Sequence, residues 1–242
     1  MLAGMGTPVY GADAAGLAEL RYAWVNDPAG SGTKVSFHAV RPTDPDTAGT
    51  GNKRCESTLA GDGLWLPWNR DFWYTVAVRT GDWHGTTDTQ AIWQWHEGSS
   101  VAGLNPMLAA FVRGSRLFIE MRSNSSAELT KASTTYRLLY TDDGWQGNRW
   151  TQFTVQARMD SQNHGTSFLR IWRDGVKIVD YSGPVGYLYA NPKDYAKNGI
   201  YHWTNGNDWD PKVAKREAWF KGPALVLHRS GYTESAVSNL LR

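Results

Sequence analysis

The sequence predicts an all-β protein with one core, and three observations support this. About ten or more short segments alternate apolar and polar residues, Gly, Asp and Asn turns separate them, and almost no segment has a helical period. The 242 residues include 13 Trp, 11 Tyr and 25 Gly but only 20% charged residues, which is typical of sheet-rich proteins. Sandwiches of this length are often undivided. We therefore predict two packed antiparallel sheets, a concanavalin-like β-jelly-roll sandwich, formed by residues 31–242 as a single domain.

The lead-in, one hairpin turn, the tail and the strands each have a recognisable sequence pattern. Residues 1–30 are rich in Gly and Ala, and we expect a partly flexible lead-in with one short helix around 12–20. Asp174-Gly175 predicts a tight hairpin, because both central positions of that turn need positive φ. The tail 233–241 predicts one short helix. The expected strands are 34–41, 53–57, 71–79, 91–98, 107–112, 116–122, 134–140, 150–159, 167–173, 176–181, 195–203 and 223–228.

Charge and cysteine usage exclude several classes of protein. A net charge of +2 and a pI near 8.6 are too mild for a nucleic-acid binder, and no apolar run reaches the length of a membrane span. The single Cys55 excludes an internal disulfide, so stability must come from the core. Residues 1–15 lack a basic n-region and resemble a flexible start or the remnant of a processed leader. We expect a monomer with neither nucleic-acid nor membrane partners.

The strand at 91–98 carries the first candidate site residues. Strict alternation predicts Ile92, Gln94 and His96 on one face, and Ala91, Trp93 and Trp95 on the opposite face, toward the core. A buried amide or imidazole costs free energy unless its donors and acceptors are paired, so Gln94 and His96 suit a polar groove. The alternative is a pair of ordinary polar residues on a solvated sheet face.

Two further segments place polar residues at a spacing of two. Arg54 and Glu56 share one face while Cys55 points into the sandwich, and Tyr195, Lys197 and Tyr201 follow one another along a later strand. If these strands are neighbours on a concave sheet, the groove holds a guanidinium, an amide, an imidazole, an ammonium and phenols. That set of groups points to β-elimination from a uronic acid.

The chemistry of that reaction suggests a role for each candidate residue. Removal of the C5 proton gathers negative charge on the carboxylate, which Arg54 and Gln94 can stabilise. A base must accept the proton and an acid must protonate the C4 oxygen, and His96 and Tyr201 are the candidates. A tyrosine acts as the base only where nearby positive charge, such as Lys197, lowers its pKa.

These residues resemble the signatures of a known family. Arg54-Cys55-Glu56, Gln94-Trp95-His96 and Tyr195-Ala196-Lys197-Asn198-Gly199-Ile200-Tyr201 look like the R-x-E, Q-x-H and Y-x-K-x-G-x-Y motifs of jelly-roll polysaccharide lyases, in the same order. The family includes alginate lyases, glucuronan lyases and heparin lyase I-like enzymes. The resemblance spans roughly residues 34–228. The Gln-Trp-His form of the second motif, the later Gly-Ile-Tyr and the hairpin segment 172–180 resemble the glucuronan and heparin-lyase-like branch most.

The resemblance implies roles for these residues. His96 matches the general base, Tyr201 the general acid or both acid and base, and Gln94 with Arg54 the carboxylate-neutralising pair. It also implies that substrate is bound by Lys197, Tyr195 and Glu56. It further implies a catalytic domain that needs no cofactor, an acidic polysaccharide substrate of the glucuronan type, and a secreted or periplasmic location.

Stereochemistry leaves the choice of base open. In glucuronate and mannuronate the C5 proton and the C4 oxygen lie on the same side, so one tyrosine can serve twice. In guluronate and iduronate they lie on opposite sides and two groups are required. The sequence also departs from the alginate pattern, because no second Arg follows the first motif and His202-Trp203 follows Tyr201.

Two other classes of protein, and a few further residues and loops, also have to be considered. A glycoside hydrolase would need paired carboxylates, and a non-catalytic lectin would use tryptophan plates without the three motifs. His38, His84, His164, His202 and His228 show no metal-ligand spacing. The loop 204–210 has enough oxygens for a structural Ca²⁺, but Asn, Asp and Gly are also turn formers, and we favour the turn. The run 212–217 predicts a solvated face.

Overall fold

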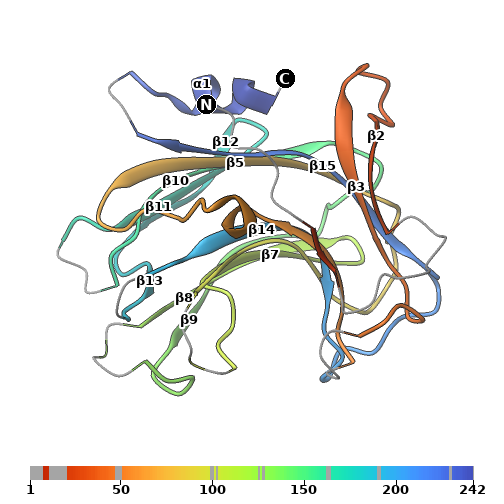
Figure 1. Cartoon of the computed structure of the whole chain (residues 1–242), viewed down its shortest axis with the longest axis horizontal. Coiled ribbons are helices and arrows are strands. Elements are labelled where there is room, and N and C mark those ends of the chain that lie inside the picture. Colours follow the sequence, from red (N-terminus) through yellow and green to blue (C-terminus); the bar gives the residue numbers. More distant parts are fainter. Residues whose placement is uncertain are drawn as a thin grey trace.

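A computed structural model describes most of the chain. The residues described are 8–10, 21–46, 51–98, 101, 103–124, 126, 129–161, 165–189, 192–228 and 231–241. Two sheets lie face to face in them, with short helical segments on the outer side of one (Figure 1). This confirms the predicted jelly-roll sandwich.

The first sheet has eight strands, and all its pairs are antiparallel except the short pair β13 with β8. In spatial order its strands are β1 (Pro8–Tyr10), β4 (Lys53–Thr58), β14 (Tyr195–His202), β6 (Gln90–His96), β7 (Leu108–Arg113), β8 (Arg116–Asn124) and β13 (Gly186–Tyr187), with β9 (Thr135–Asp142) also paired to β8. The three predicted motif segments are thus the adjacent strands β4, β14 and β6.

The second sheet has seven strands. In spatial order they are β12 (Val176–Ser182), β11 (Phe168–Arg173), β10 (Thr151–Arg158), β5 (Asp71–Thr80), β15 (Arg216–Leu227), β3 (Lys34–Val40) and β2 (Tyr22–Asn26). A 3₁₀ turn, η1 (Leu59–Asp62), follows β4, and the tail forms α1 (Glu234–Ser238) and η2 (Asn239–Leu241). These last two confirm the tail helix and lie on the outer side of the second sheet (Figure 1). No helix of the described residues is long and apolar enough to span a membrane.

The expected lead-in contributes to both sheets. β1 pairs with β4 and β2 pairs with β3, so ordered structure begins before residue 31. The Gly and Ala content predicts a flexible segment, whereas residues 22–26 form a strand of the second sheet. The helix expected around 12–20 lies outside the described residues.

Strand β15 is longer than predicted. It begins at Arg216, whereas the sequence predicts a strand only over 223–228. A register shift between Lys221 and Ala224 accommodates the proline, which has no N–H to donate to a ladder. By contrast, the hairpin prediction is confirmed, because Asp174 and Gly175 have φ values of 50° and 81°.

The core fills the space between the sheets. Phe72, Tyr74, Val76 and Val78 form one fully buried face of β5, as their alternation predicts. They pack against aromatic side chains of β6, with Trp95 in contact with both Phe72 and Tyr74. Full burial of one such side chain stabilises the fold by about 1.5–3 kcal/mol. The core therefore fixes which face of β6 points outward.

A bulge in β6 changes two predicted orientations, those of Ala91 and Ile92. The pairing of β6 with β7 shifts between Ala91 and Trp93, so Ile92 and Trp93 both point into the core. Ala91 packs instead with Phe111 on the outer face. The prediction that Ile92 shares a face with Gln94 is therefore wrong, because an extra residue in a strand breaks strict alternation.

Candidate active site

The outer face of the first sheet carries the predicted residues in rows that cross the strands. The central row consists of Thr58, Lys197, Gln94, Ala109 and Glu120, on β4, β14, β6, β7 and β8 respectively. Adjacent residues of such a row lie about 5 Å apart, so a chain that binds across it meets all five strands.

Two further rows flank Gln94 on opposite sides. Tyr201 pairs with Arg54 and with Ala91, whereas His96 pairs with Tyr195. A sugar bound at Gln94 therefore has the row of Tyr201 on one side and the row of His96 on the other. All three motif strands thus meet on one face, as predicted.

Arg54 and Tyr201 are in direct contact. The guanidinium carbon of Arg54 lies 4.7 Å from the centroid of the Tyr201 ring. Burial raises the pKa of Tyr201, and the positive charge of Arg54 works against that rise. The arrangement favours transient ionisation of this phenol over that of an isolated buried tyrosine.

Glu56 holds Gln94 and Arg54 rather than facing the groove. The residue is only 2% exposed, and its Oε1 accepts a hydrogen bond from Nε2 of Gln94. Its Oε2 lies 4.0 Å from Nη1 of Arg54. A buried carboxylate with these two contacts orients the amide and the guanidinium. Direct binding of substrate by Glu56, expected from the motif, stays a prediction, because Gln94 lines the groove and is equally buried.

His96 lies at the end of β6, in contact with Tyr195 and Glu97. Its ring stacks on that of Tyr195 at 5.9 Å between centroids, and Trp65 meets the same tyrosine edge-on at 6.2 Å. Nδ1 of His96 lies 3.0 Å from a carboxylate oxygen of Glu97. The side chain of His96 is 23% exposed, so one side of the ring remains open to solvent.

Lys197 lies beneath the groove surface. It is 6% exposed, and its ammonium lies 5.4 Å from the centroid of the Tyr195 ring. Burial lowers the pKa of Lys197, while the charge of Glu56 counteracts that effect. Tyr195 is also partly buried, and its pKa is raised by burial and by nearby carboxylates. Both residues shape the electrostatics of the His96 end of the site.

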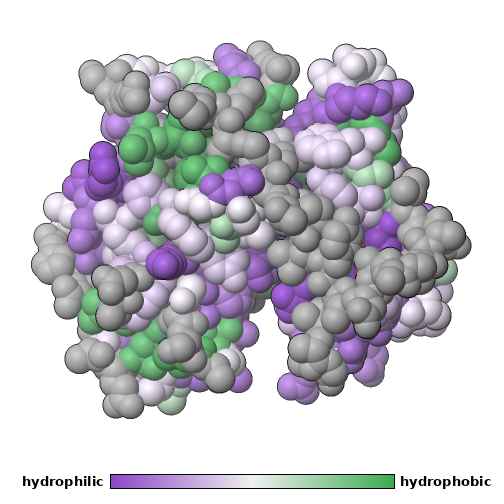
Figure 2. Space-filling view, viewed as in Figure 1, coloured by the Kyte–Doolittle hydropathy of each residue, from purple (hydrophilic) through white to green (hydrophobic). Residues whose placement is uncertain are grey.

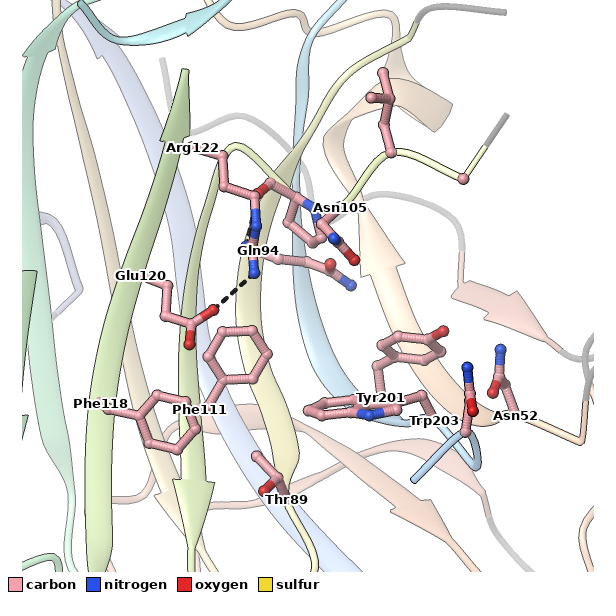
Figure 3. Close-up of a pocket in the computed structure, with 14 residues that line it drawn as sticks. Asn52, Thr89, Gln94, Asn105, Phe111, Phe118, Glu120, Arg122, Tyr201 and Trp203 are labelled. Carbon is pink, nitrogen blue, oxygen red and sulfur yellow. Dashed lines mark hydrogen bonds and ion pairs between the residues drawn. The ribbon is translucent and has the colours of Figure 1, made fainter. Parts of the chain in front are cut away.

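A groove of about 670 Å³ lies beside Gln94 and Glu120 of the central row and Tyr201 of one flanking row. Figure 3 shows Gln94, Tyr201 and Trp203 around one space, with Glu120 and Arg122 across from them. The space-filling view shows the molecule notched on the side of the first sheet (Figure 2). The residues that line the groove are Asn52, Thr89, Gln94, Gly103, Leu104, Asn105, Pro106, Phe111, Phe118, Glu120, Arg122, Tyr201, Trp203 and Asn205. Of the predicted site residues, only Gln94 and Tyr201 are among them.

Several lining residues were missed by the sequence analysis. Trp203 follows Tyr201 by two residues, so alternation alone could have placed it on the same face. Glu120 and Arg122 have the same spacing and form an ion pair of 2.9 Å. Phe111 and Phe118 stack at 5.1 Å between centroids, but nothing in an apolar strand residue distinguishes a groove wall from a core.

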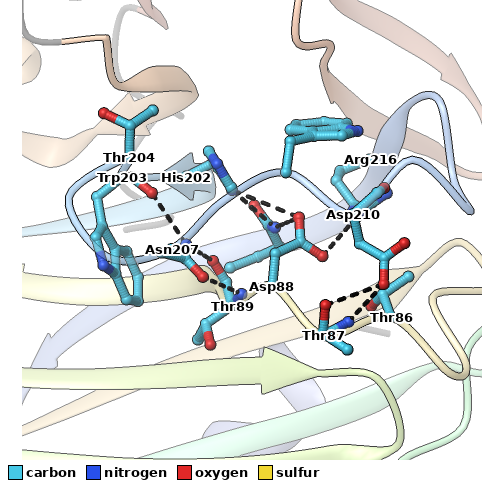
Figure 4. A network of polar contacts seen from close by, with 12 residues as sticks. Thr86, Thr87, Asp88, Thr89, His202, Trp203, Thr204, Asn207, Asp210 and Arg216 are labelled. Carbon is cyan, nitrogen blue, oxygen red and sulfur yellow. Dashed lines mark hydrogen bonds and ion pairs between the residues drawn. The ribbon is translucent and has the colours of Figure 1, made fainter.

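A buried polar network supports the loop that carries Trp203. Asp88 forms an ion pair of 2.6 Å with Arg216, and both side chains are fully buried (Figure 4). Gln90 joins them by donating to Asp88 and contacting Nδ1 of His202. His202 therefore points away from Tyr201, as alternation predicted. The solvated face predicted for 212–217 is wrong for Arg216, because a buried carboxylate pairs with it.

Side-chain oxygens of the loop 204–210 accept hydrogen bonds from other parts of the chain. Asn207 bridges the backbone of Thr89 through Oδ1 and Nδ2, and also donates to the carbonyl of Trp203. Asp210 accepts hydrogen bonds from Thr87 and Lys212. These bonds favour the turn over a Ca²⁺ site. Within the described residues, no group of three or more His, Cys, Asp or Glu side chains could hold a metal ion.

Sequence comparison identifies the family. Residues 10–222 match the polysaccharide lyase family, so the chain belongs to it. The protein is therefore a polysaccharide lyase, and the resemblance found in its motifs is confirmed. This favours a lyase over the hydrolase and the lectin that the sequence left open. No curated protein matches the chain.

Solved structures share the fold at low sequence identity. The endo-β-1,4-glucuronan lyase from the fungus Trichoderma reesei is 16% identical with a TM-score of 0.66, and the match covers 93% of this chain and 96% of that one. An alginate lyase from Pseudomonas aeruginosa is 15% identical with a TM-score of 0.56, over 87% of each chain. An alginate lyase of polysaccharide lyase family 7 is 14% identical with a TM-score of 0.57, over 85% of this chain and 82% of that one.

Proposed function

We propose that the protein cleaves a uronic acid polymer, of the glucuronan type, by β-elimination that leaves a 4,5-unsaturated uronate at the new end. The observation that carries the proposal is the placement of Tyr201 under the charge of Arg54, beside Gln94, in the groove of the first sheet. The similarity to a glucuronan lyase, higher in TM-score than that to the alginate lyases above, supports the choice of polymer. A secreted or periplasmic location stays a prediction.

The reaction would use the groups as follows. The amide of Gln94 and the guanidinium of Arg54 bind the carboxylate of the sugar and stabilise the charge that develops on it when C5 loses its proton. The electron pair left at C5 forms the C4–C5 double bond, and the C4–O bond breaks. The departing oxygen takes a proton from the acid. These groups supply the chemistry without a cofactor.

Tyr201 would act as both base and acid on a glucuronate. The C5 proton and the C4 oxygen lie on the same side of that sugar, so one tyrosine can accept the first proton as its phenolate and then return it to the oxygen. His96 lies on the other side of Gln94, and we propose it as the base for sugars whose two groups lie on opposite sides. Lys197 and Tyr195 would adjust the charge around His96.

One experiment tests both the reaction and the polymer. The protein is incubated with glucuronan, alginate, ulvan, heparin, hyaluronan and a gellan-like polymer, and the ultraviolet absorbance of the new double bond is followed. We expect the absorbance to rise most with glucuronan. Reducing ends without absorbance would indicate hydrolysis, and binding without either would indicate a lectin; each would refute the proposal.

Variants test the assignment of the residues. Tyr201→Phe should abolish turnover on every substrate, while His96→Ala should retain part of the activity on glucuronan. Tyr181→Phe is a matched control, because this tyrosine lies on β12 in the second sheet and donates to the carbonyl of Pro184. Full activity of Tyr201→Phe on the preferred polymer would contradict the assignment.

A further inference from the structure

Two acceptors surround one nitrogen of His96. Nδ1 lies 3.1 Å from the carbonyl oxygen of Glu97 and 3.0 Å from its carboxylate Oε2. Neither oxygen can donate when the carboxylate is ionised, so a bare Nδ1 would set its lone pair against theirs. The proton of a neutral imidazole therefore belongs on Nδ1, which leaves Nε2 with a free lone pair.

One carboxylate oxygen of Glu97 is buried without a hydrogen bond to the described part of the chain. The residue is 6% exposed, and its Oε2 has no hydrogen-bond partner among the described residues, although Nδ1 of His96 lies 3.0 Å from it. A buried carboxylate oxygen without a donor costs free energy. By contrast, the neighbouring buried Asp194 is satisfied, because Tyr189 and Trp68 donate to its two oxygens. Glu97 is thus the buried acid of this region that faces the imidazole.

We propose that Glu97 is a positioning residue for His96: it holds the ring in the tautomer with Nδ1 protonated, so that Nε2 can accept the proton of the substrate. This rests on the role of His96 as a base in the proposed function. When Nε2 takes that proton the imidazole becomes a cation, and the adjacent carboxylate stabilises the charge without itself taking up a proton. The carboxylate and the imidazole would then act as a unit.

The tautomer can be observed without any substrate. Nitrogen NMR of the uniformly labelled protein reports which ring nitrogen of each histidine carries the proton, and His96→Gln identifies the His96 signals. In the unmodified protein at a pH where the ring is neutral, we expect Nδ1 of His96 to be protonated. In Glu97→Gln, the amide can donate to Nδ1, so we expect a larger population with the proton on Nε2.

Kinetics provide the second readout. On a polymer for which His96→Ala lowers turnover, Glu97→Gln should lower kcat by roughly 10- to 100-fold with KM changed by less than about twofold, as expected for a residue that acts through another. Asp194→Asn is the control, because it removes a buried acid nearby that contacts Tyr189 and Trp68 instead of His96. It should leave the His96 tautomer unchanged.

The outcomes separate this proposal from the proposed function. A proton on Nε2 of His96 in the unmodified protein, or an unchanged tautomer and kcat in Glu97→Gln, would overturn the role of Glu97. If no polymer is cleaved at all, the proposed function fails and the NMR result still decides the position of the proton. If Glu97→Gln does not fold, Glu97→Asp replaces it: drawing the carboxylate back by one methylene should shift the tautomer in the same direction, and no shift refutes the proposal.

Discussion

Arg54 covers one face of the Tyr201 ring, with its guanidinium carbon 4.7 Å from the ring centroid. The two residues are directly paired on β4 and β14, so the sheet itself fixes their contact. Burial raises the pKa of the phenol, and the guanidinium is the main group that opposes this. Proton transfer by Tyr201 should therefore depend on Arg54 even before the substrate carboxylate arrives.

Replacement of Arg54 should change the pH profile of the reaction. The base form of Tyr201 is the phenolate, whose population grows as pH rises toward the pKa. Arg54→Met removes the charge that lowers this pKa, so the alkaline rise of kcat should move to higher pH, and kcat at neutral pH should fall by at least tenfold. The measurement is kcat against pH. Arg170→Met, on β11 in the second sheet, is the control, and an unshifted rise in Arg54→Met would contradict the coupling.

The aromatic wall of the groove should contribute to substrate binding. Trp203 meets Phe111 edge-on at 5.7 Å between centroids, and both line the groove. An aromatic contact contributes about 0.5–1.5 kcal/mol, so Trp203→Ala should raise KM roughly two- to tenfold with a smaller change in kcat. Steady-state kinetics on the preferred polymer test this. Trp24→Ala, at an exposed tryptophan of β2, should change neither constant.

The buried pair of Asp88 and Arg216 should be costly to break. Both side chains are inaccessible to solvent, so Asp88→Asn leaves a buried guanidinium without its counter-charge. Removal of one partner of such a pair typically costs about 3–5 kcal/mol, whereas replacing both with apolar groups costs far less. Denaturant unfolding should show this loss for Asp88→Asn and a smaller loss for Asp88→Leu/Arg216→Met. Equal losses in the two variants would argue against a penalty for the unpaired charge.

Alternation and turn chemistry predicted most of the fold. The faces of β5, the Asp174-Gly175 turn and the inward position of Cys55 follow from local rules that act within a few residues. Those rules failed where the tertiary structure overrides them. The bulge at Ile92 is set by the pairing of β6 with β7, and the burial of Arg216 depends on Asp88, which lies 128 residues away.

The sequence predicted part of the candidate site, as it predicted part of the fold. The three motifs brought Arg54, Gln94 and Tyr201 together because polar residues at a spacing of two mark an outward sheet face. The sequence could not show that Glu56 lies under this face, since burial depends on how neighbouring side chains cover it. It also did not single out Glu97, whose contact with His96 forms only where the chain leaves β6.

Two buried groups should give the protein an unusual dependence of stability on pH. Burial lowers the pKa of His38 to about 4, from an ordinary value of 6.5, so its contribution to stability is complete above pH 6.5 and is lost as pH falls toward 4. Burial raises the pKa of Asp194 to about 6, from 3.8, so its contribution is complete below pH 3.8 and is lost as pH rises toward 6. Each difference corresponds to about 3 kcal/mol, and the two effects have opposite signs between pH 4 and 6.

Replacing one or the other group should therefore change the slope of the free energy of unfolding against pH in opposite directions. In Asp194→Asn, the loss that His38 causes on acidification is no longer offset, so the free energy of unfolding should fall more steeply from pH 6 to pH 4. In His38→Gln the same interval should become flatter or reverse, although burial also lowers the pKa of His202 and adds to the acid sensitivity that remains. Urea unfolding at half-unit pH steps measures both slopes. The unfolded states of both variants titrate with ordinary pKa values. Equal slopes of the free energy of unfolding against pH in the two variants would therefore mean that burial does not shift the pKa of either group in the folded protein.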